Sequence, residues 1–344
     1  MTEPILIRAY KKEKTEHTPI WMMRQAGRHL PEYLKVRAEH SINEVINNPE
    51  LAFEVTMQPL RRYPVDAAII FADLLTPLQG LGFEFDFIKS FGPKVHDPVT
   101  SALDLDRMTE FNPTTATAGT LEALRLMRAE LKDTGRALIG FSGAPFTLSS
   151  YMIEGKSNPK LNLTKKFIFN EESAWHVLQE KLVVALGDYL IAQVEAGAQA
   201  VQIFDSWLGG MSVRQYQQYV EPYVKALISR VKDSTDVPVV FFATGVGHLY
   251  QEFLKLPADV IGVDWRQDLS TAQAIFQNRF ALQGNLDPLL LFADGEKVEE
   301  EAKKILSQTK DIEGFVFNLG HGILPETPIE NVERLVKLVH EFKS

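Results

Sequence analysis

The stretch "EKLVVALGDYLIAQVEAGAQAVQIF" (residues 180–204) indicates the fold class. Residues 180–198 carry apolar side chains with the period of a helix, and Gly197 is typical of the position just past a helix end. The continuous apolar run at 200–204 is typical of a parallel strand covered on both faces. The stretch therefore predicts a helix followed by a buried parallel strand.

Similar apolar runs recur along the chain. The candidate strands are "PIWMM" (19–23), "AAIIF" (67–71), "ALIGF" (137–141), "AVQIF" (200–204), "VPVVFF" (237–242), "VIGV" (260–263), "FALQG" (280–284) and "FVF" (315–317). Strands that alternate with helices predict an α/β fold, a single (β/α)8 TIM barrel, although a doubly wound open sheet fits the same alternation. No linker divides the chain, so we expect one barrel domain over residues 18–344 and a mobile polar tail over residues 1–17.

The last helix has a recognisable start. Thr327 is a candidate N-cap, Pro328 suits the first helical position and Glu330 the third, and a periodic apolar pattern follows.

Composition narrows the function. The 344 residues are 45% hydrophobic and 24% charged, with a net charge of −9 and no basic block, so nucleic-acid and anionic membrane surfaces are not expected partners. The chain has no cysteine, which excludes disulfides, thiolate metal sites, iron–sulfur clusters and cysteine nucleophiles. Without a signal sequence or a long apolar run, the expected location is the cytoplasm.

Polar residues directly follow the candidate strands, where the loops of a parallel barrel form its mouth. They are Arg24, Asp73, Ser142, Ser206, Thr244, Asp264, Asn285 and His321. Each could also be a helix cap or a structural hydrogen bonder. Together they predict a polar floor to the mouth.

Two arginines stand out in "WMMRQAGRHLPEY" (21–33). Arg24 and Arg28 flank Gly27, and no acidic residue lies between Trp21 and Pro31 to pair with them. Either a ligand supplies the negative charge, or the arginines lie on an ordinary helix surface.

Three other side chains are candidates for contact with a ligand. Asp73 could cap the next helix, or it could face the N–H groups of a ligand and stabilise a developing positive charge. His321 lies between two glycines, which would let the imidazole approach a ligand closely. Tyr151 could face the site, or it could pack with its hydroxyl bonded to the backbone.

Ordered motifs then suggest a family. They are "PIWMMRQAGRHLPEY" (19–33), "MQPLRRYPVDAAIIFADLL" (57–75), "GFSGAPFTLSSYMIEG" (140–155), "FDSWLGG" (204–210), "GVDWR" (262–266), "QGNLDP" (283–288) and "NLGHGILPETP" (318–328). This series resembles the successive signatures of the uroporphyrinogen decarboxylase family. The resemblance covers nearly the whole chain and implies a distorted barrel.

The resemblance also implies an activity. Members of this family are carboxy-lyases of heme biosynthesis that convert uroporphyrinogen III, with eight carboxylates, to coproporphyrinogen III by decarboxylating its four acetate arms. It implies catalysis without a metal or an organic cofactor, and a homodimer.

The family's site residues map onto this chain one by one. Arg24 and Arg28 would bind substrate carboxylates, Gly27 would let the backbone come close, and Gln25, next to Ala26, would add neutral donors. The resemblance implies catalytic roles for Asp73, Arg24, Arg28 and Tyr151, and substrate contacts for Arg24, Gln25, Ala26, Gly27, Arg28, Asp73, Tyr151, Phe204, Ser206 and His321. The proton donor could be a water or a substrate carboxylic acid, because Arg24 is a poor acid.

This sequence departs from the family pattern at several positions. The usual glycine-rich run is replaced by "GKSNPKLNLTKK" (155–166), which predicts a stiffer loop. His29, Leu34 and Ala72 replace a common tyrosine, a basic residue and a serine. One carboxylate contact could be shifted, with Arg37 either supplying part of the charge or lying on a solvated helix face.

Two other functions fit part of the pattern. Corrinoid methyltransferases of the same superfamily hold zinc through histidine and cysteine thiolates, and the absence of cysteine argues against them. A non-catalytic tetrapyrrole-binding protein would explain the arginines but not an ionised Asp73 beneath the ring.

Overall fold

The computed structural model describes residues 3–88 and 92–343. Residues 1, 2, 89–91 and 344 of the expected tail and barrel lie outside this description. Within it, one parallel sheet has the strand order β1-β4-β5-β6-β7-β8-β9. The strands are β1 (Ala67–Ile69), β4 (Ala137–Gly143), β5 (Ala200–Asp205), β6 (Val239–Ala243), β7 (Val260–Gly262), β8 (Ala281–Leu286) and β9 (Phe315–Leu319).

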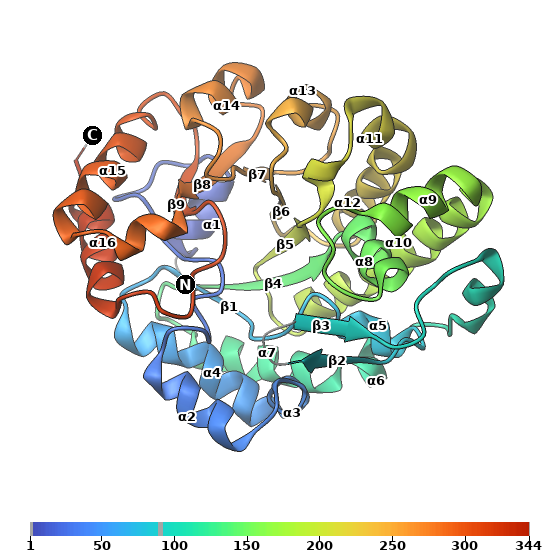
Figure 1. Cartoon of the computed structure of the whole chain (residues 1–344). Helices are drawn as coiled ribbons and strands as arrows, with labels where there is room; N and C mark the ends of the chain where they lie inside the picture. Colours follow the sequence, from blue (N-terminus) through green and yellow to red (C-terminus); the bar gives the residue numbers. More distant parts are fainter. Residues whose placement is uncertain (1–2, 89–91, 344) are drawn as a thin grey trace.

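Helices surround this curled sheet (Figure 1). They are α1 (Ile5–Tyr10), α2 (Pro31–Glu39), α3 (Ile42–Asn47), α4 (Pro49–Arg62), α5 (Thr76–Gly80), α6 (Pro113–Ala116), α7 (Ala118–Glu130), α8 (Pro145–Glu154), α9 (Asn162–Asn170), α10 (Glu172–Glu195), α11 (Val213–Tyr219), α12 (Glu221–Ser234), α13 (Tyr250–Phe253), α14 (Leu269–Phe276), α15 (Gly295–Ser307) and α16 (Ile329–Glu341). Among the described residues, no helix is long and apolar enough to cross a membrane.

The eighth strand position is filled irregularly. The predicted strand at 19–23 is wrong as a regular strand, because only Ile20 forms a bridge, to Phe317 of β9. On its other side the carbonyl of Ile20 accepts the N–H of Asp66, just before β1, at 2.9 Å. Side chains then take the place of a strand neighbour: the N–H of Met23 donates to Asn318 Oδ1 at 3.0 Å. The remaining seven predicted strands are confirmed, and the barrel is distorted at this closure.

The expected mobile tail is wrong for residues 5–10. They form helix α1, and Leu6, Ile7, Ala9 and Tyr10 are buried. The Tyr10 hydroxyl hydrogen-bonds to Gln283 of β8, inside the barrel. The lysines near residues 5–10 make the segment polar on average, although one face of the helix is apolar. Burial of that face favours a helix packed on the barrel over a mobile tail.

Two helix boundaries test the local predictions. Gly197 follows α10 with φ 119°, so the predicted helix stop before β5 is confirmed. The predicted cap of α16 is wrong: the helix starts at Ile329, and the Thr327 hydroxyl accepts the N–H of Leu324 at 3.3 Å instead. The hydroxyl therefore stabilises the preceding turn.

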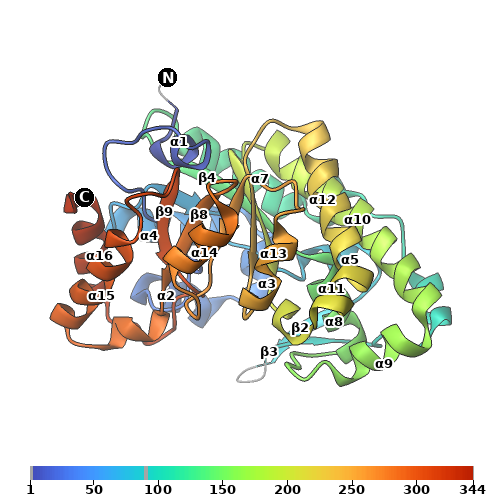
Figure 2. The ribbon, with the colours of Figure 1, turned by 90° about the horizontal axis from the view of Figure 1, so that it is seen from above.

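The two ends of the barrel differ. An antiparallel hairpin, β2 (Phe85–Ile88) with β3 (Gly92–Val95), follows β1 and was not predicted. The N–H of Val95 donates to Gly155 at 2.8 Å and that of Val99 to Met152 at 2.9 Å, which ties the hairpin to α8. Helix α1 lies at the opposite end (Figure 2). The hairpin end is where the strands finish, so it is the mouth.

Candidate active site

The loop at residues 24–28 enters the mouth in an unusual backbone conformation. Arg24 (φ 62°), Gly27 (φ 93°) and Arg28 (φ 51°) all lie in the left-handed region. Gln25 is fully buried, its Nε2 donates to Ala67 O at 2.8 Å, and its Oε1 accepts the N–H of Met22 at 2.9 Å. Both atoms of the Gln25 side-chain amide thus have protein partners that fix the loop, and a contact with a ligand stays a prediction. Ala26 is also buried, in a small apolar cluster with Val45 and Val55.

Two glycines make room for this arrangement. A β-carbon on Gly27 would lie 3.2 Å from the ring of Phe71, in a conformation that already disfavours other residues. A β-carbon on Gly322 would lie 2.5 Å from Cδ of Arg24. The stem of Arg24 thus lies directly against the backbone beside His321.

The arginines keep their charge available. Among residues 3–88 and 92–343, neither Arg24 nor Arg28 forms an ion pair with a carboxylate. The side chain of Arg24 is exposed, and that of Arg28 is half-buried. Neither residue lies in a described helix, so the helix-surface alternative does not apply. A ligand as their counter-charge stays a prediction that this geometry favours.

Asp73 has the predicted capping role and keeps one oxygen for a ligand. Its Oδ1 accepts the N–H of Leu75 at 2.9 Å, and its own N–H donates to Thr76 Oγ1 at 3.2 Å, so it caps the turn before α5. Burial raises the pKa of its carboxyl group, while the Leu75 hydrogen bond and the positive charge of Arg24 oppose that rise. Within the described residues, Oδ2 has no hydrogen-bond partner and can accept from a ligand.

Tyr151 of α8 faces the same space. Its ring packs edge-on against Trp207 at 5.8 Å. Burial, and then the negative charge of Asp73, raise the pKa of the hydroxyl to about 12, while Arg24 acts in the opposite direction. Tyr151 therefore stays protonated and can donate a hydrogen bond at neutral pH.

His321 completes the group at the mouth. His321 is exposed to solvent, yet desolvation by the surrounding protein lowers the pKa of its imidazole, and the positive charges of Arg24 and Arg266 lower it further. The glycines beside it admit protein atoms, because a β-carbon on Gly320 would lie 2.2 Å from the backbone nitrogen of Trp265. A neutral His321 can donate to or accept from a substrate.

Arg266 was not predicted as a site residue. Its Nη1 donates to the buried Asp264 at 2.7 Å, and its guanidinium stacks over Trp265 at 4.4 Å. It adds positive charge near His321. The motif "GVDWR" (262–266) contains Arg266 and was the available signal in the sequence.

The end of β5 contributes an aromatic wall. Phe204 is half-buried and packs edge-on against Phe141 at 5.7 Å and Phe242 at 5.9 Å. The carbonyl of Ser206 accepts the hydroxyl of Thr244 at 2.8 Å, which holds this loop to the end of β6. An apolar ring surface beside polar groups suits a ligand with both characters.

Other strand-end residues are structural. Ser142 is buried with its hydroxyl bonded to Gly143 O at 3.1 Å, and Asn285 donates to Asp264 O at 3.0 Å. Asp264 also accepts the N–H of Gly245 at 2.6 Å. For these residues the structural interpretation is confirmed.

The atypical loop at 155–166 closes around a carboxylate. Buried Glu154 accepts the N–H of Thr164 at 2.8 Å and the side-chain amide of Asn158 at 2.7 Å. These bonds are consistent with the predicted stiffer loop.

The other departures from the family pattern lie outside the site or at its edge. His29 is buried and bonds the Tyr63 hydroxyl at 2.9 Å, Leu34 is exposed, and Arg37 donates to the carbonyl of His40 at the end of α2. The Arg37 contact favours its structural interpretation.

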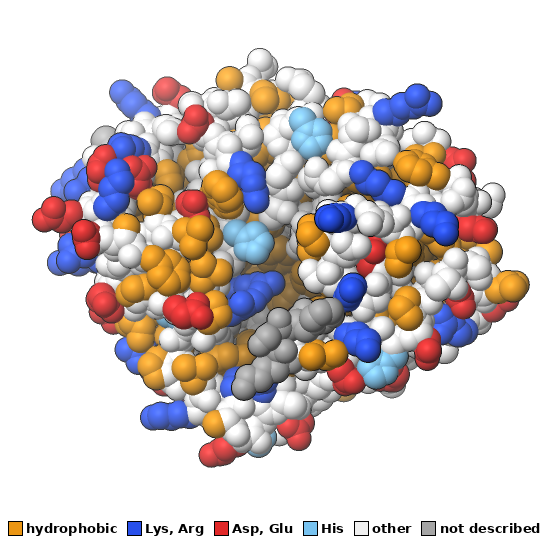
Figure 3. Space-filling view, in the orientation of Figure 1, with side chains coloured by type: hydrophobic (Ala, Val, Ile, Leu, Met, Phe, Trp, Pro, Cys, Tyr) orange, Lys and Arg blue, Asp and Glu red, His pale blue; other side chains and the backbone are white. Residues whose placement is uncertain are grey.

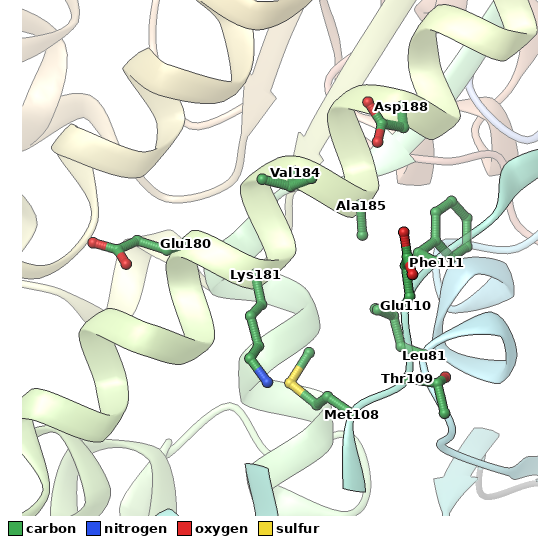
Figure 4. Close-up of a pocket in the computed structure, with 10 residues that line it drawn as sticks. All are labelled: Leu81, Met108, Thr109, Glu110, Phe111, Glu180, Lys181, Val184, Ala185 and Asp188. Carbon is green, nitrogen blue, oxygen red and sulfur yellow. The ribbon is translucent and has the colours of Figure 1, made fainter. Parts of the chain in front are cut away.

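The surface agrees with this location. A hollow opens on the face of Figure 3, with apolar side chains in its depth and basic and histidine side chains at its rim. A different groove of about 440 Å3 lies between α10 and residues 108–111 (Figure 4). Its charged lining is Glu110, Glu180, Lys181 and Asp188, which is mostly acidic and would repel a polycarboxylate.

Comparisons with known proteins identify the family of the chain. The family model described as uroporphyrinogen decarboxylase (URO-D) matches residues 1–342. A curated uroporphyrinogen decarboxylase from Chloroflexus aurantiacus is 46% identical over 98% of this chain and 95% of its own length. One from Staphylococcus haemolyticus is 41% identical over 98% of each chain.

A solved structure shows the same fold at greater distance. A methyltransferase from Methanosarcina mazei aligns with a TM-score of 0.78 over 99% of each chain, at 21% identity. That likeness supports the fold alone, whereas the sequence matches extend over the whole chain. This chain belongs to the uroporphyrinogen decarboxylase family.

Proposed function

We propose that this chain decarboxylates the four acetate side chains of uroporphyrinogen III and releases coproporphyrinogen III. The observation that carries the proposal is the family match over residues 1–342, with relatives at 40–46% identity that bear this name. The mouth supports it, because Arg24 has no carboxylate partner among the described residues and lies within electrostatic reach of the half-buried Asp73 and of Tyr151.

Binding would divide the substrate between two kinds of surface. Its carboxylates would face Arg24 and Arg28, which can form charge-assisted hydrogen bonds and lack other counter-charges among the described residues. The macrocycle would lie against Phe204, a half-buried ring near the end of β5. His321 and the Tyr151 hydroxyl would place the reacting arm by donating to its oxygens.

When carbon dioxide leaves, the electron pair of the broken carbon–carbon bond stays on the substrate and must be accepted by another group. A proton added to a pyrrole carbon makes the ring cationic, so that the electron pair of the breaking bond to carbon dioxide can flow into the ring. A proton then adds to the exocyclic carbon, which becomes a methyl group, and the ring loses its extra proton. Each arm consumes one proton in total and releases one carbon dioxide.

Asp73 would lower the barrier to this step electrostatically. Its free Oδ2 would accept the pyrrole N–H groups, and its negative charge would stabilise the ring cation. Burial raises the pKa of Asp73 in the free protein. A cationic ring beside it would act in the opposite direction and favour the ionised carboxylate.

A direct assay tests the proposal. The purified chain is incubated with uroporphyrinogen III under reducing, anaerobic conditions, and the carboxyl groups of the product are counted. Stepwise conversion from eight to four carboxyl groups is expected. A bound but unchanged octacarboxylate would make the chain a tetrapyrrole carrier instead.

The cellular location and the oligomeric state are part of the same proposal. We expect a cytoplasmic homodimer whose two mouths face each other across the interface. The family resemblance supports the dimer, and the absence of cysteine fits a reducing compartment.

A further inference from the structure

A second polar cluster lies at the barrel end away from the mouth. His17 precedes the irregular eighth strand position, Asp66 precedes β1, and His340 lies near the end of α16. One ligand atom from each lies within 4.8 Å of the other two. Helix α1 and the end of α16 both lie toward this end (Figure 2). The cluster thus joins three segments that are remote in sequence.

Its distances suit a metal ion. Nε2 of His17 lies 3.3 Å from Oδ1 of Asp66, and Nε2 of His340 lies 2.9 Å from Oδ2. Ligand atoms about 2.0–2.1 Å from a tetrahedral Zn2+ are about 3.3 Å apart. The three candidate ligand atoms already lie within 4.8 Å of one another, so rotation of the two rings would bring them toward that spacing.

The carboxylate is already oriented. Oδ2 of Asp66 also accepts the N–H of Ile20 at 2.7 Å, which directs Oδ1 toward His17. Such outer hydrogen bonds fix metal ligands in place and are part of most built sites. The rings of His17 and His340 lie 4.4 Å apart and are tilted by 59°, so both nitrogens can approach one point.

Burial leaves an entry path. The exposed fractions of the side chains are 32% for His17, 11% for Asp66 and 22% for His340. An ion can reach them from solvent, and a water can complete four-coordination. Two imidazoles with one carboxylate favour zinc and its transition-metal neighbours over Mg2+ and Ca2+, which prefer oxygen ligands.

We propose that His17, Asp66 and His340 form a Zn2+ site that fastens the N-terminal segment and α16 to the start of β1. This site is separate from the catalytic mouth and would stabilise the barrel where its eighth strand is irregular. Zn2+ bound only to the folded chain, at a free concentration of 100 times its Kd, would shift the unfolding equilibrium about 100-fold toward the folded state.

The chain offers a matched control. His96 lies 2.9 Å from Asp86, so it is a histidine–carboxylate pair without a second histidine. The variants are His17→Gln, His340→Gln and His96→Gln, each in the full-length chain after removal of metal with EDTA. Zn2+ is titrated calorimetrically, Co2+ is added as a spectroscopic probe, and thermal unfolding is followed with and without Zn2+.

We expect one Zn2+ per chain for the unmodified protein and for His96→Gln, with visible absorption bands of four-coordinate Co2+ and a higher Tm in Zn2+. His17→Gln and His340→Gln should each weaken binding by at least about tenfold, the loss that even an outer partner of a ligand causes, and should lose the Tm shift. Either no stoichiometric binding by the unmodified chain, or equal binding by all variants, overturns the proposal. Decarboxylation is not the readout, so failure here is distinct from failure of the proposed function.

Discussion

The stem of Arg24 lies so close to Gly322 that a β-carbon at position 322 would fall 2.5 Å from Arg24 Cδ. A residue of the first loop is thus positioned by the loop that follows the last strand. This contact joins the loop at residues 24–28 to the loop after β9 at the mouth and places Arg24 beside His321.

Gly322→Ala should therefore displace Arg24 and lower kcat/KM while the chain stays folded. A double-mutant cycle tests the cause, because contacting residues do not behave additively. In an Arg24→Ala background the methyl group has no guanidinium to displace, so Gly322→Ala should cost little more. Full additivity of the two losses would show that Gly322 acts independently of Arg24.

Arg28→Ala should impair decarboxylation. A charge-assisted hydrogen bond contributes about 1.5–3 kcal/mol, which corresponds to about 10- to 150-fold in kcat/KM. Arg61→Ala is the control, because Arg61 pairs with Glu54 on the exposed side of α4. Unchanged kinetics for Arg28→Ala toward the octacarboxylate would remove Arg28 from the site.

Strand and helix periodicity predicted most of the barrel, because continuous apolar runs such as 200–204 have few alternatives in a chain of this composition. The eighth strand position could not be predicted. There the N–H groups of Met22 and Met23 donate to the side chains of Gln25 and Asn318 instead of to a neighbouring strand. An apolar run in the sequence does not show that side chains replace a strand neighbour.

The candidate site was predicted mainly from its motifs. The glycines beside His321 were expected to admit a ligand, yet Gly322 admits Arg24 and Gly320 admits the backbone of Trp265. Residues far apart in sequence make these contacts, so the spacing of the glycines could not show whether they make room for a ligand or for protein atoms. The contact that fixes Gln25 could not be predicted for the same reason, since its partner Ala67 lies on another element.

Asp205 predicts a pH dependence of stability. It is fully buried at the end of β5, one oxygen accepts the Thr147 hydroxyl at 2.7 Å, and the other has no partner among the described residues. Burial raises the pKa of its carboxyl group from 3.8 to about 7. The folded chain therefore binds this proton more tightly than the unfolded chain, and the free energy of unfolding should fall as pH rises from about 4 to 7.

Asp205→Asn should remove the contribution of this carboxyl group to the decrease in the free energy of unfolding, which is on the order of 2 kcal/mol between pH 5 and pH 7. Urea unfolding at both pH values measures it. Asp188→Asn, which alters a more exposed ion pair with Arg230, is the control and should keep the fall. The same pH slope in Asp205→Asn and the unmodified chain would show that Asp205 does not titrate in this range.

Sedimentation equilibrium should show a homodimer at micromolar concentration. The expectation comes from the family and from the proposed facing mouths. A species with the mass of one chain over the whole concentration range would contradict it.

In the proposed reaction, the charge of Asp73 stabilises a cationic pyrrole ring. Asp73→Asn keeps Oδ1, which accepts the Leu75 N–H, and so preserves the turn while it removes the charge. Loss of one preorganised partner of the transition state costs about 2.7–4 kcal/mol, or about 10²- to 10³-fold in rate.

Single-turnover decarboxylation, measured beside equilibrium binding of coproporphyrinogen, separates charge from shape. We predict a rate lower by about 10²- to 10³-fold in Asp73→Asn, with binding unchanged or tighter because the polyanion no longer meets a buried negative charge. Equal rates in the two proteins, or proportional losses of rate and binding, would contradict the account.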